Sequence, residues 1–218
     1  MKRFNAKPTE HHRAYGTALH DRDMKPVICY GSAGTGKTYT AMKAAMAQLE
    51  AGTIKQIICI RPNVSFADKS GFLPGTEREK MEPWVRPILQ SLGKLGYSES
   101  HIQMMEKSGV LVFFPLEHIQ GLTFDNAFIL LDEVQNMSFE QLKVFLTRTG
   151  NWSRVVLAGD IAQISPRFHN SGLAKLLHMV DALDLQIHTI EFGHEDILRG
   201  PVCRDMIIAF EEYEEDYE

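Results

Sequence analysis

One run of eight residues, at positions 31–38, constrains this chain more than any other feature. The run reads Gly-Ser-Ala-Gly-Thr-Gly-Lys-Thr and fits the pattern Gly-x-x-x-x-Gly-Lys-Thr. It lies between a strand-like apolar segment (26–30) and a helix-like segment (37–49). Glycines let a backbone wrap an anion, so that main-chain N–H groups and the positive end of a helix point toward it. The run is therefore predicted to bind nucleotide phosphates, with Lys37 on the β- and γ-phosphates and Thr38 on Mg²⁺. The predicted nucleotide contacts are Gly31, Ser32, Ala33, Gly34, Thr35, Gly36, Lys37, Thr38 and Tyr39.

Strand-like and helix-like segments alternate along the chain, which predicts an α/β fold with a mostly parallel sheet and helices on both faces. The predicted strands are residues 26–30, 55–61, 110–114, 127–131, 154–158 and 187–192. The predicted helices are residues 37–49, pieces of 88–107 broken near Gly93 and Gly96, 138–147, 174–183 and a last helix from Pro201, with a proline-rich connection at 62–87. We expect one P-loop domain over residues 26–210, preceded by a helical lead-in (1–25) and followed by an acidic tail (211–218). Ligands of such sheets bind at the carboxyl ends of the strands.

Composition limits the compartment and the partners. The chain has no apolar stretch long enough for a membrane span and no apolar signal region near its start, so we expect a cytoplasmic protein with no membrane partner. Its three cysteines are far apart, which favours reduced thiols over disulfides. The net charge of −5 is concentrated in residues 211–218, which hold six acids and no base. This tail is expected to be poorly ordered, or alternatively to shield a basic groove, and the nearly neutral remainder can still present a basic face.

Two later strands also end in polar side chains. The apolar segment 127–131 is followed by Asp132 and Glu133, at the edge where phosphates and Mg²⁺ would lie. Asp132 is predicted to hold Mg²⁺, directly or through water, and Glu133 to orient and deprotonate the attacking water as general base. Gln163, beyond the strand at 154–158, has an amide that can donate to a γ-phosphate oxygen and accept from that water. Each exit alone is typical of an ordinary turn, and the P-loop is what favours the catalytic interpretation.

These motifs resemble those of a known family. Residues 31–38, 132–136 and 159–163 are similar to the Walker A, Walker B and third motifs of superfamily 1 helicase-type RecA-like ATPases. More narrowly, the chain resembles the PhoH family at Arg61-Pro62 and at residues 71–75 with 79–80, 121–124, 146–150, 171–173 and 195–199. The resemblance spans about residues 26–208. It implies a cytoplasmic ATP-binding protein with one RecA-like core, NTPase activity and an RNA-related role; the nuclease domain that some relatives carry is not implied for this chain.

Hydrolysis requires positive charge against the γ-phosphate, as an arginine finger supplies. The candidates are Arg199, from the resemblance, and Arg148, which follows the predicted helix at 138–147; either could instead be a surface arginine. Because the chain encodes one RecA-like core, we expect the finger to come from a neighbouring subunit of a homo-oligomer such as a hexameric ring. The adenine-reading glutamine of many superfamily 1 relatives is missing from residues 9–15, where His11 and His12 either read the base or are simply exposed.

The connection at 62–87 is the candidate for gripping a nucleic acid. It mixes aromatic and basic side chains, as single-strand binding surfaces do, and long loops are uncommon without a function. Asn63 and Ser65 fall where related motors touch the nucleic-acid backbone, an assignment implied by the resemblance alone. The alternative is a well-packed loop in which Phe72 and Trp84 are core anchors. The candidate nucleic-acid contacts are Arg61, Asn63, Ser65, Lys69 and Lys80.

The sequence thus predicts Mg²⁺-dependent ATP hydrolysis coupled to single-stranded nucleic acid, RNA more than DNA. The predicted catalytic residues are Lys37, Asp132, Glu133, Gln163, Arg199 and Arg148, with Thr38 and Asp132 on the metal. One alternative is a P-loop kinase acting on a small molecule or a polynucleotide, which would require an acceptor for turnover. The other is a non-catalytic, ATP-gated assembly module, which would tolerate Glu133→Gln.

Overall fold

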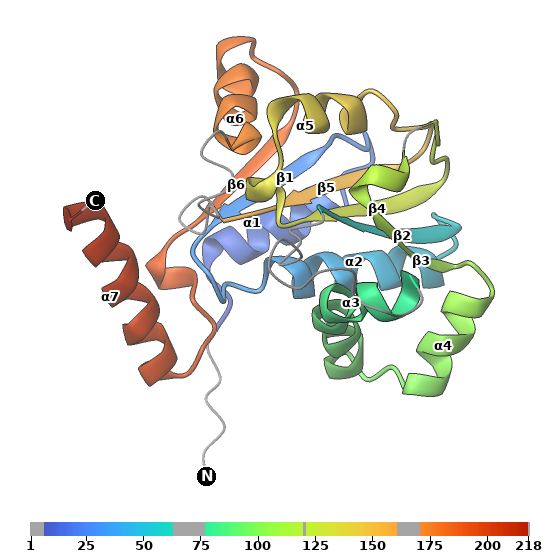
Figure 1. The fold of residues 1–218 in the computed structure, drawn as a ribbon, viewed down its shortest axis with the longest axis horizontal. Helices are drawn as coiled ribbons and strands as arrows, with labels where there is room; N and C mark the ends of the chain where they lie inside the picture. Colours follow the sequence, from blue (N-terminus) through green and yellow to red (C-terminus); the bar gives the residue numbers. More distant parts are fainter. Residues whose placement is uncertain (1–6, 63–76, 120, 161–170, 218) are drawn as a thin grey trace.

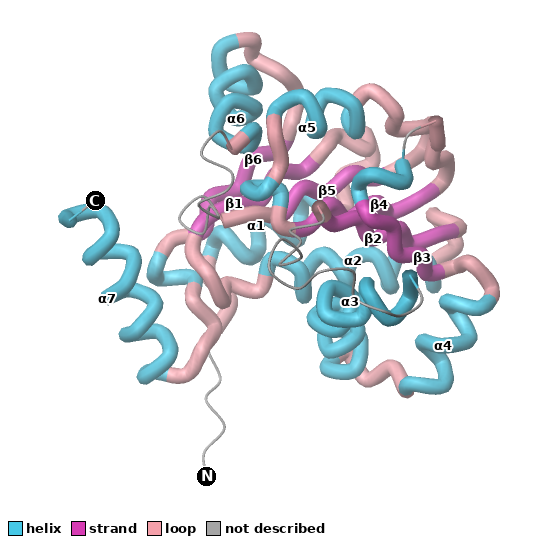
Figure 2. The backbone as a smooth tube through the Cα atoms, in the orientation of Figure 1, coloured by secondary structure: helices cyan, strands magenta, loops and turns pink. Residues whose placement is uncertain are grey.

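Six parallel strands form the sheet of this protein. The computed structural model describes residues 7–62, 77–119, 121–160 and 171–217 (Figures 1 and 2). The strand order is β3-β2-β4-β5-β1-β6, and every described pair is parallel. The prediction of an α/β fold with a mostly parallel sheet is therefore confirmed. The strands are β1 (Val27–Gly31), β2 (Gln56–Arg61), β3 (Leu111–Pro115), β4 (Ala127–Asp132), β5 (Arg154–Ala158) and β6 (His188–Phe192).

Helices cover both faces of the sheet, as predicted. One face carries α1 (Glu10–Leu19), α2 (Lys37–Glu50), α3 (Glu77–Lys94) and α4 (Glu99–Lys107). The other face carries α5 (Phe139–Leu146) and α6 (Gly172–Ala182). The last helix, α7 (Pro201–Tyr217), stands apart from both layers at the left of Figure 1. Short 3₁₀ turns, η2 (Leu116–Ile119), η3 (Val134–Asn136) and η6 (His194–Asp196), follow three of the strands.

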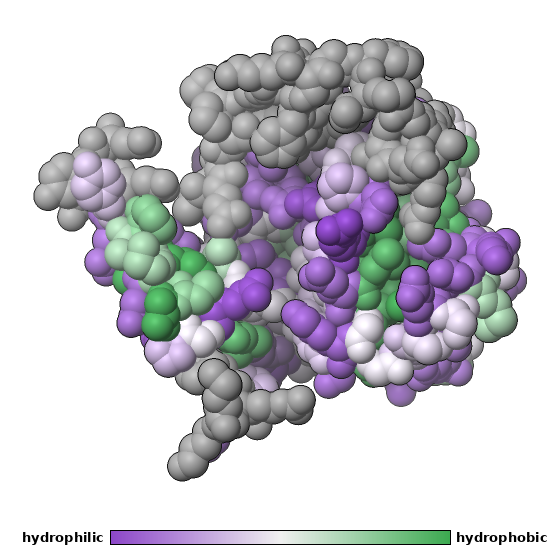
Figure 3. Space-filling model, turned by 60° about the horizontal axis from the view of Figure 1, so that its bottom comes forward, coloured by the Kyte–Doolittle hydropathy of each residue, from purple (hydrophilic) through white to green (hydrophobic). Residues whose placement is uncertain are grey.

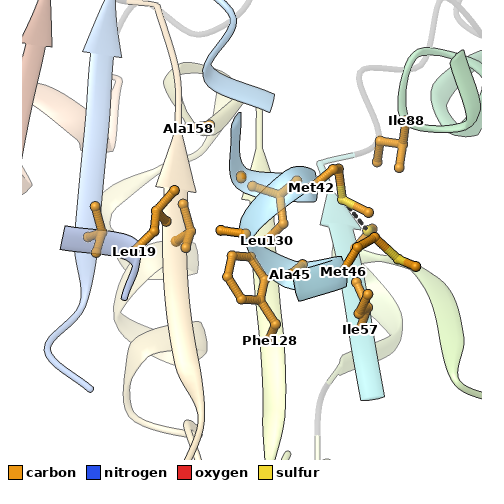
Figure 4. Close-up of a cluster of buried hydrophobic side chains, with 14 of the residues drawn as sticks. Leu19, Met42, Ala45, Met46, Ile57, Ile88, Phe128, Leu130 and Ala158 are labelled. Atoms are coloured by element: carbon orange, nitrogen blue, oxygen red, sulfur yellow. Dashed lines mark hydrogen bonds between the residues drawn. The ribbon is translucent and has the colours of Figure 1, made fainter. Parts of the chain in front are cut away.

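The core consists of two apolar layers, one on each side of the sheet. Successive side chains of a strand point to opposite faces, so Phe128 and Leu130 of β4 join the layer under α1–α4, whereas Ile129 and Leu131 join the layer under α5 and α6. Figure 4 shows Met42 of α2 lying over the first of these layers. Strands buried on both faces must be apolar throughout, which explains the continuous apolar runs in the sequence.

The predicted connection at 62–87 is wrong in its second half. Helix α3 already begins at Glu77 and passes through Pro83 and Pro87. Its half-buried Trp84 lines a small pocket with Phe113 of β3 but is not one of the buried core residues, and Phe72 lies outside the described residues. The predicted break near Gly93 and Gly96 is confirmed: α3 ends at Lys94, α4 begins at Glu99, and the chain turns between them at Gly96, whose φ of +99° suits glycine.

The acidic segment 211–217 is helical in the structure, whereas the sequence predicted a poorly ordered tail. Helix α7 begins at Pro201 and continues through Tyr217, so the acids at its end extend a helix. Two contacts attach this helix to the body: the Glu211 carboxylate accepts a hydrogen bond from Ser32 Oγ (2.9 Å) and lies 2.7 Å from His194 Nε2. The tail is thereby anchored to the P-loop.

Helix α7 also carries the exposed apolar side chains Val202, Met206 and Phe210, which contribute to the green patch at the left of Figure 3, and the exposed ring of Tyr213. Among the described residues, no helix is both long enough and apolar enough to cross a membrane.

Candidate nucleotide-binding and catalytic site

The P-loop connects β1 to α2 and forms an anion-binding cradle. Gly34 and Gly36 adopt φ values of +74° and +84°, which glycine adopts without steric cost. Gly36 is also the N-cap of α2, so no side chain caps the first N–H groups of the helix. Those N–H groups are therefore available to an anion, and the helix dipole favours negative charge there.

The cradle opens into a cavity of about 300 Å³ at the carboxyl ends of β1, β4 and β5. Most predicted site residues that the structure describes meet there, including Lys37, Thr38, Asp132, Glu133 and Arg199. The cavity also contains residues that sequence reasoning missed: Gln90, Ser91 and Lys94 of α3, Gln135 of η3, and Asp160 after β5. Gln90, Ser91 and Lys94 are spaced so that they share one face of α3. Their place in the cavity depends on α3 packing beside the P-loop, which the sequence pattern alone does not indicate.

The Lys37 side chain folds back onto the P-loop that precedes it. Its Nζ donates to the carbonyl oxygens of Gly31 (2.6 Å) and Ser32 (2.8 Å). The side chain therefore lies across the loop, with its charge where phosphate oxygens would be bound. The role predicted for Lys37 on the β- and γ-phosphates stays a prediction.

Thr38 and Asp132 form the candidate Mg²⁺ site. Thr38 Oγ1 donates to Asp132 Oδ1 across 3.1 Å, joining the start of α2 to the end of β4. Burial raises the pKa of the Asp132 carboxyl, and the charge of Arg61 and the Thr38 hydrogen bond oppose this increase in part. Mg²⁺ prefers hydroxyl and carboxylate oxygens, and a cation would offset the burial of this charge. The two residues therefore fit the ion.

Glu133 is held from two sides. Arg61 Nη2, at the end of β2, lies 2.8 Å from Glu133 Oε1, and Gln135 Nε2 donates to Glu133 Oε2 across 2.7 Å. Gln135 is itself fixed, because it is buried and its Oε1 accepts from the backbone N–H of Asp160 at 3.1 Å. Glu133 also has a left-handed backbone with φ +58°, a conformation that is uncommon outside glycine and recurs at functional sites.

Helix α1 supports the cradle from behind through a buried polar network. His12 Nε2 lies 2.9 Å from the Thr35 carbonyl oxygen, and Thr9 links His12 to the buried Asp196. His12 is only 8% exposed, so the alternative that it is simply an exposed residue is wrong, whereas the other candidate base-reading residue, His11, is exposed and pairs with Asp196. Burial alone would raise the pKa of Asp196, but its hydrogen bonds from Thr9, the Gly193 N–H and His11 lower it overall.

The two candidate arginine fingers lie at opposite ends of the sheet. Arg199 lines the cavity of its own chain, because the Leu198 N–H donates to the Gly34 carbonyl and carries the next residue onto the P-loop. A finger from a neighbouring subunit was expected, so this intramolecular placement differs from the prediction. Arg148 follows α5 beside Thr149, which bridges to Phe124 before β4 starts, at the amino end of the sheet. The structure thus does not bring Arg148 to the cavity of its own chain.

Several predicted residues lie outside the described residues. They are Gln163 among the catalytic candidates and Asn63, Ser65 and Lys69 among the nucleic-acid contacts. Lys80 falls in the first turn of α3. Of the five candidate nucleic-acid contacts, Arg61 is the one whose side-chain geometry the structure gives, and it is engaged with Glu133.

The sheet order, the cradle and the carboxylates at the end of β4 together define a RecA-like P-loop domain. A solved structure with this fold, the large terminase from a thermophilic bacteriophage, has a TM-score of 0.57 and 13% identity, covering 97% of this chain and 51% of that one. The family model for the PhoH-like protein matches residues 6–211. The chain belongs to the PhoH family.

Relatives in three bacteria are named for this family. The chain is 38% identical over 200 residues to a PhoH-like protein of Bacillus subtilis (strain 168), covering 91% of this chain and 61% of that protein. It is 40% identical over 190 residues to a PhoH-like protein of Mycobacterium tuberculosis (strain H37Rv), covering 87% and 53%. It is 34% identical over 198 residues to Protein PhoH of Escherichia coli (strain K12), covering 90% and 55%. The chain thus spans between half and two thirds of the length of these relatives.

Proposed function

We propose that this chain hydrolyses ATP with Mg²⁺ and couples hydrolysis to a single-stranded nucleic acid, RNA in preference to DNA. One observation carries the proposal: a single cavity collects a phosphate-binding lysine, a hydroxyl–carboxylate pair suited to Mg²⁺, a second carboxylate and an arginine. This is the set of groups that phosphoryl transfer to water requires. The coupling to nucleic acid draws support from the resemblance to helicase-type motors.

In the proposed reaction Lys37 exchanges the carbonyls of Gly31 and Ser32 for the β- and γ-phosphate oxygens. Thr38 and Asp132 would hold the Mg²⁺ ion, which would supply charge neutralisation to the phosphates. Glu133 orients the attacking water and takes its proton. Arg199, held over Gly34, supplies positive charge to the same nucleotide from the same chain.

We place the proposed activity in the cytoplasm; the homo-oligomer stays a prediction, because Arg199 in the cavity of its own chain removes the need for a finger from a neighbouring subunit. The reducing compartment agrees with Cys29 and Cys59 being free and buried in the structure. Burial raises the pKa of the Cys29 thiol to about 12, which keeps it protonated and unreactive.

The proposal is tested by steady-state ATP turnover of the purified chain beside Lys37→Ala and Glu133→Gln, with Mg²⁺ or a chelator and with single-stranded RNA or DNA. We expect Glu133→Gln to lower turnover by about 10²–10⁴-fold while ATP still binds, because it removes the base and leaves the cradle. Lys37→Ala loses binding as well. Glu99→Gln, an exposed carboxylate on α4, is the matched control and keeps the wild-type rate.

Other results would replace the proposal with a rival. Turnover that depends on an added phosphate acceptor identifies a kinase. Tight ATP binding without hydrolysis, with Glu133→Gln behaving like the wild type, identifies an assembly module. If neither RNA nor DNA changes the rate of ATP turnover, the ATPase activity stands and the proposed nucleic-acid partner is rejected.

A further inference from the structure

The two groups that hold Glu133 differ in how firmly they are fixed. Gln135 is 1% exposed and is locked by the Asp160 N–H, so its contact with Glu133 Oε2 belongs to the interior. Arg61 comes from the neighbouring strand β2, and the side chains of Arg61 and Glu133 are 25% and 31% exposed. The Glu133 Oε2 atom therefore has a buried partner, whereas Oε1 takes part in an ion pair that solvent reaches.

The contact with Arg61 bears directly on the role of Glu133. A carboxylate that positions a water and accepts its proton must turn an oxygen toward that water, within hydrogen-bond reach. In this structure one oxygen faces the Arg61 guanidinium and the other faces the Gln135 amide. Arg61 thus competes with the attacking water for Glu133.

Arg61 can also be taken away from Glu133 by a suitable anion. A guanidinium binds phosphate with two parallel hydrogen bonds, a geometry well matched to the backbone of a nucleic acid. A partly exposed ion pair is weak, so a phosphate diester that docks at the end of β2 can compete for it. The same side chain therefore has two possible partners, and each excludes the other.

We propose that the Arg61–Glu133 ion pair is the switch through which the nucleic-acid strand controls hydrolysis, with Arg61 holding Glu133 until a backbone phosphate of the strand takes Arg61 over. This inference rests on the proposed function, since it assigns the partner's point of action within the same site. Glu133 is the catalytic residue, and Arg61 acts through it as a positioning residue.

The first experiment compares Arg61→Gln with the wild type and with Arg22→Gln, an exposed arginine before β1 at the far end of the sheet. We expect Arg61→Gln to raise the rate of ATP turnover without polymer several-fold, and to reduce the stimulation by single-stranded RNA nearly to one-fold. Arg61→Lys keeps a charge that binds phosphate less specifically, and is expected to fall between the two. Arg22→Gln keeps both wild-type values.

A second experiment uses the reciprocity of the two contacts. Glu133→Gln removes the charge that competes for Arg61, so it is expected to bind a fluorescently labelled single-stranded RNA several-fold more tightly than the wild type, without nucleotide, in an anisotropy titration. In a double-mutant cycle, this gain disappears when Arg61→Gln is already present. If Glu133→Gln still increases the affinity for RNA when Arg61→Gln is present, the increase comes from removing a general charge repulsion, and the switch is overturned.

The outcomes separate this inference from the function on which it rests. If the wild type shows no ATP turnover under any condition, the proposed function fails and the switch with it. If turnover occurs and RNA stimulates it equally in Arg61→Gln and the wild type, the function stands and the switch is overturned. A lower rate without polymer in Arg61→Gln, with the stimulation ratio unchanged, also overturns it, because Arg61 would then only orient the base.

Discussion

The two halves of the cavity are supported in different ways. The phosphate cradle is supported from behind by residues that are almost fully buried, His12 at 8% and Asp196 at 0% exposure, through hydrogen bonds that link α1, η6 and the P-loop. The half that carries Glu133 is held on its outer side by an ion pair with Arg61 that is a quarter to a third exposed. The cradle is thus supported by buried contacts, whereas Glu133 has one buried contact, with Gln135, and one contact that solvent reaches, with Arg61.

This difference matches the tasks of the two halves. A phosphate-binding cradle gains from fixed N–H groups, because nothing must be reorganised when charge arrives. In the proposed switch, Glu133 becomes active only when a nucleic-acid strand binds. Its ion pair with Arg61 must then break at a small cost in free energy.

The largest effect is expected at the start of the cradle, with Gly31→Ala. Gly31 has a φ of +110°, and a Cβ there would lie 2.0 Å from the carbonyl oxygen of Phe192. Because neither backbone can give way without moving β1 or β6, we expect a loss of more than about 3 kcal/mol in unfolding free energy. Urea denaturation measures it, with Gly52→Ala as the control: Gly52 also has a positive φ, but the space around it is open. Equal losses in both variants would mean that backbone strain alone acts at Gly31.

The next effect concerns the buried network behind the cradle. Asp196→Asn weakens the hydrogen bonds to Thr9, Gly193 and His11, and we expect a loss of about 1–3 kcal/mol at pH 7. Because the pKa of Asp196 is lowered in the folded state, its contribution is complete above the ordinary carboxyl value of 3.8 and is lost as the pH falls through the lower folded value. The difference between variant and wild type in urea denaturation should therefore shrink in acid.

A control for this network is Asp181→Asn, an exposed carboxylate on α6, expected to stay within about 0.5 kcal/mol of the wild type. A loss for Asp196→Asn that is the same at pH 7 and pH 3 would argue against an ionised Asp196 as the source of the stability.

Asp132→Asn is expected to act in the opposite direction. Burial raises the pKa of this carboxyl in the folded state, so its charge at neutral pH opposes folding. Removing the charge should stabilise the protein by about 0.5–2 kcal/mol while turnover is lost, a common trade-off between stability and activity. A thermal melt in the presence of a chelator measures the gain as a rise of a few degrees in Tm. A lower Tm would mean that the Thr38 hydrogen bond and the Arg61 charge outweigh the burial.

Sequence reasoning predicted the cradle well because the motif is local. Residues 31–38 are contiguous, and the apolar runs that flank them predict β1 and α2 within a residue or so. The network behind the cradle joins His12 to Thr35 and Thr9 to Asp196, contacts that span 23 and 187 positions and leave no periodic trace. The ion pair of Arg61 and Glu133 could not be predicted either, because it depends on β2 and β4 being neighbours in the sheet.

The smallest expected effect on stability is that of Arg61→Gln, at the exposed side of Glu133. Arg61→Gln removes a partly exposed ion pair, so we expect the unfolding free energy to change by less than about 1 kcal/mol, in contrast to the losses behind the cradle. Urea denaturation beside Asp196→Asn provides the direct test. A loss as large as that of Asp196→Asn would make Arg61 a structural support of the β2–β4 pair, and the half with Glu133 would then be as rigid as the cradle. A small loss accompanied by a changed turnover rate would place the effect of Arg61 on the chemistry of Glu133 and not on the fold.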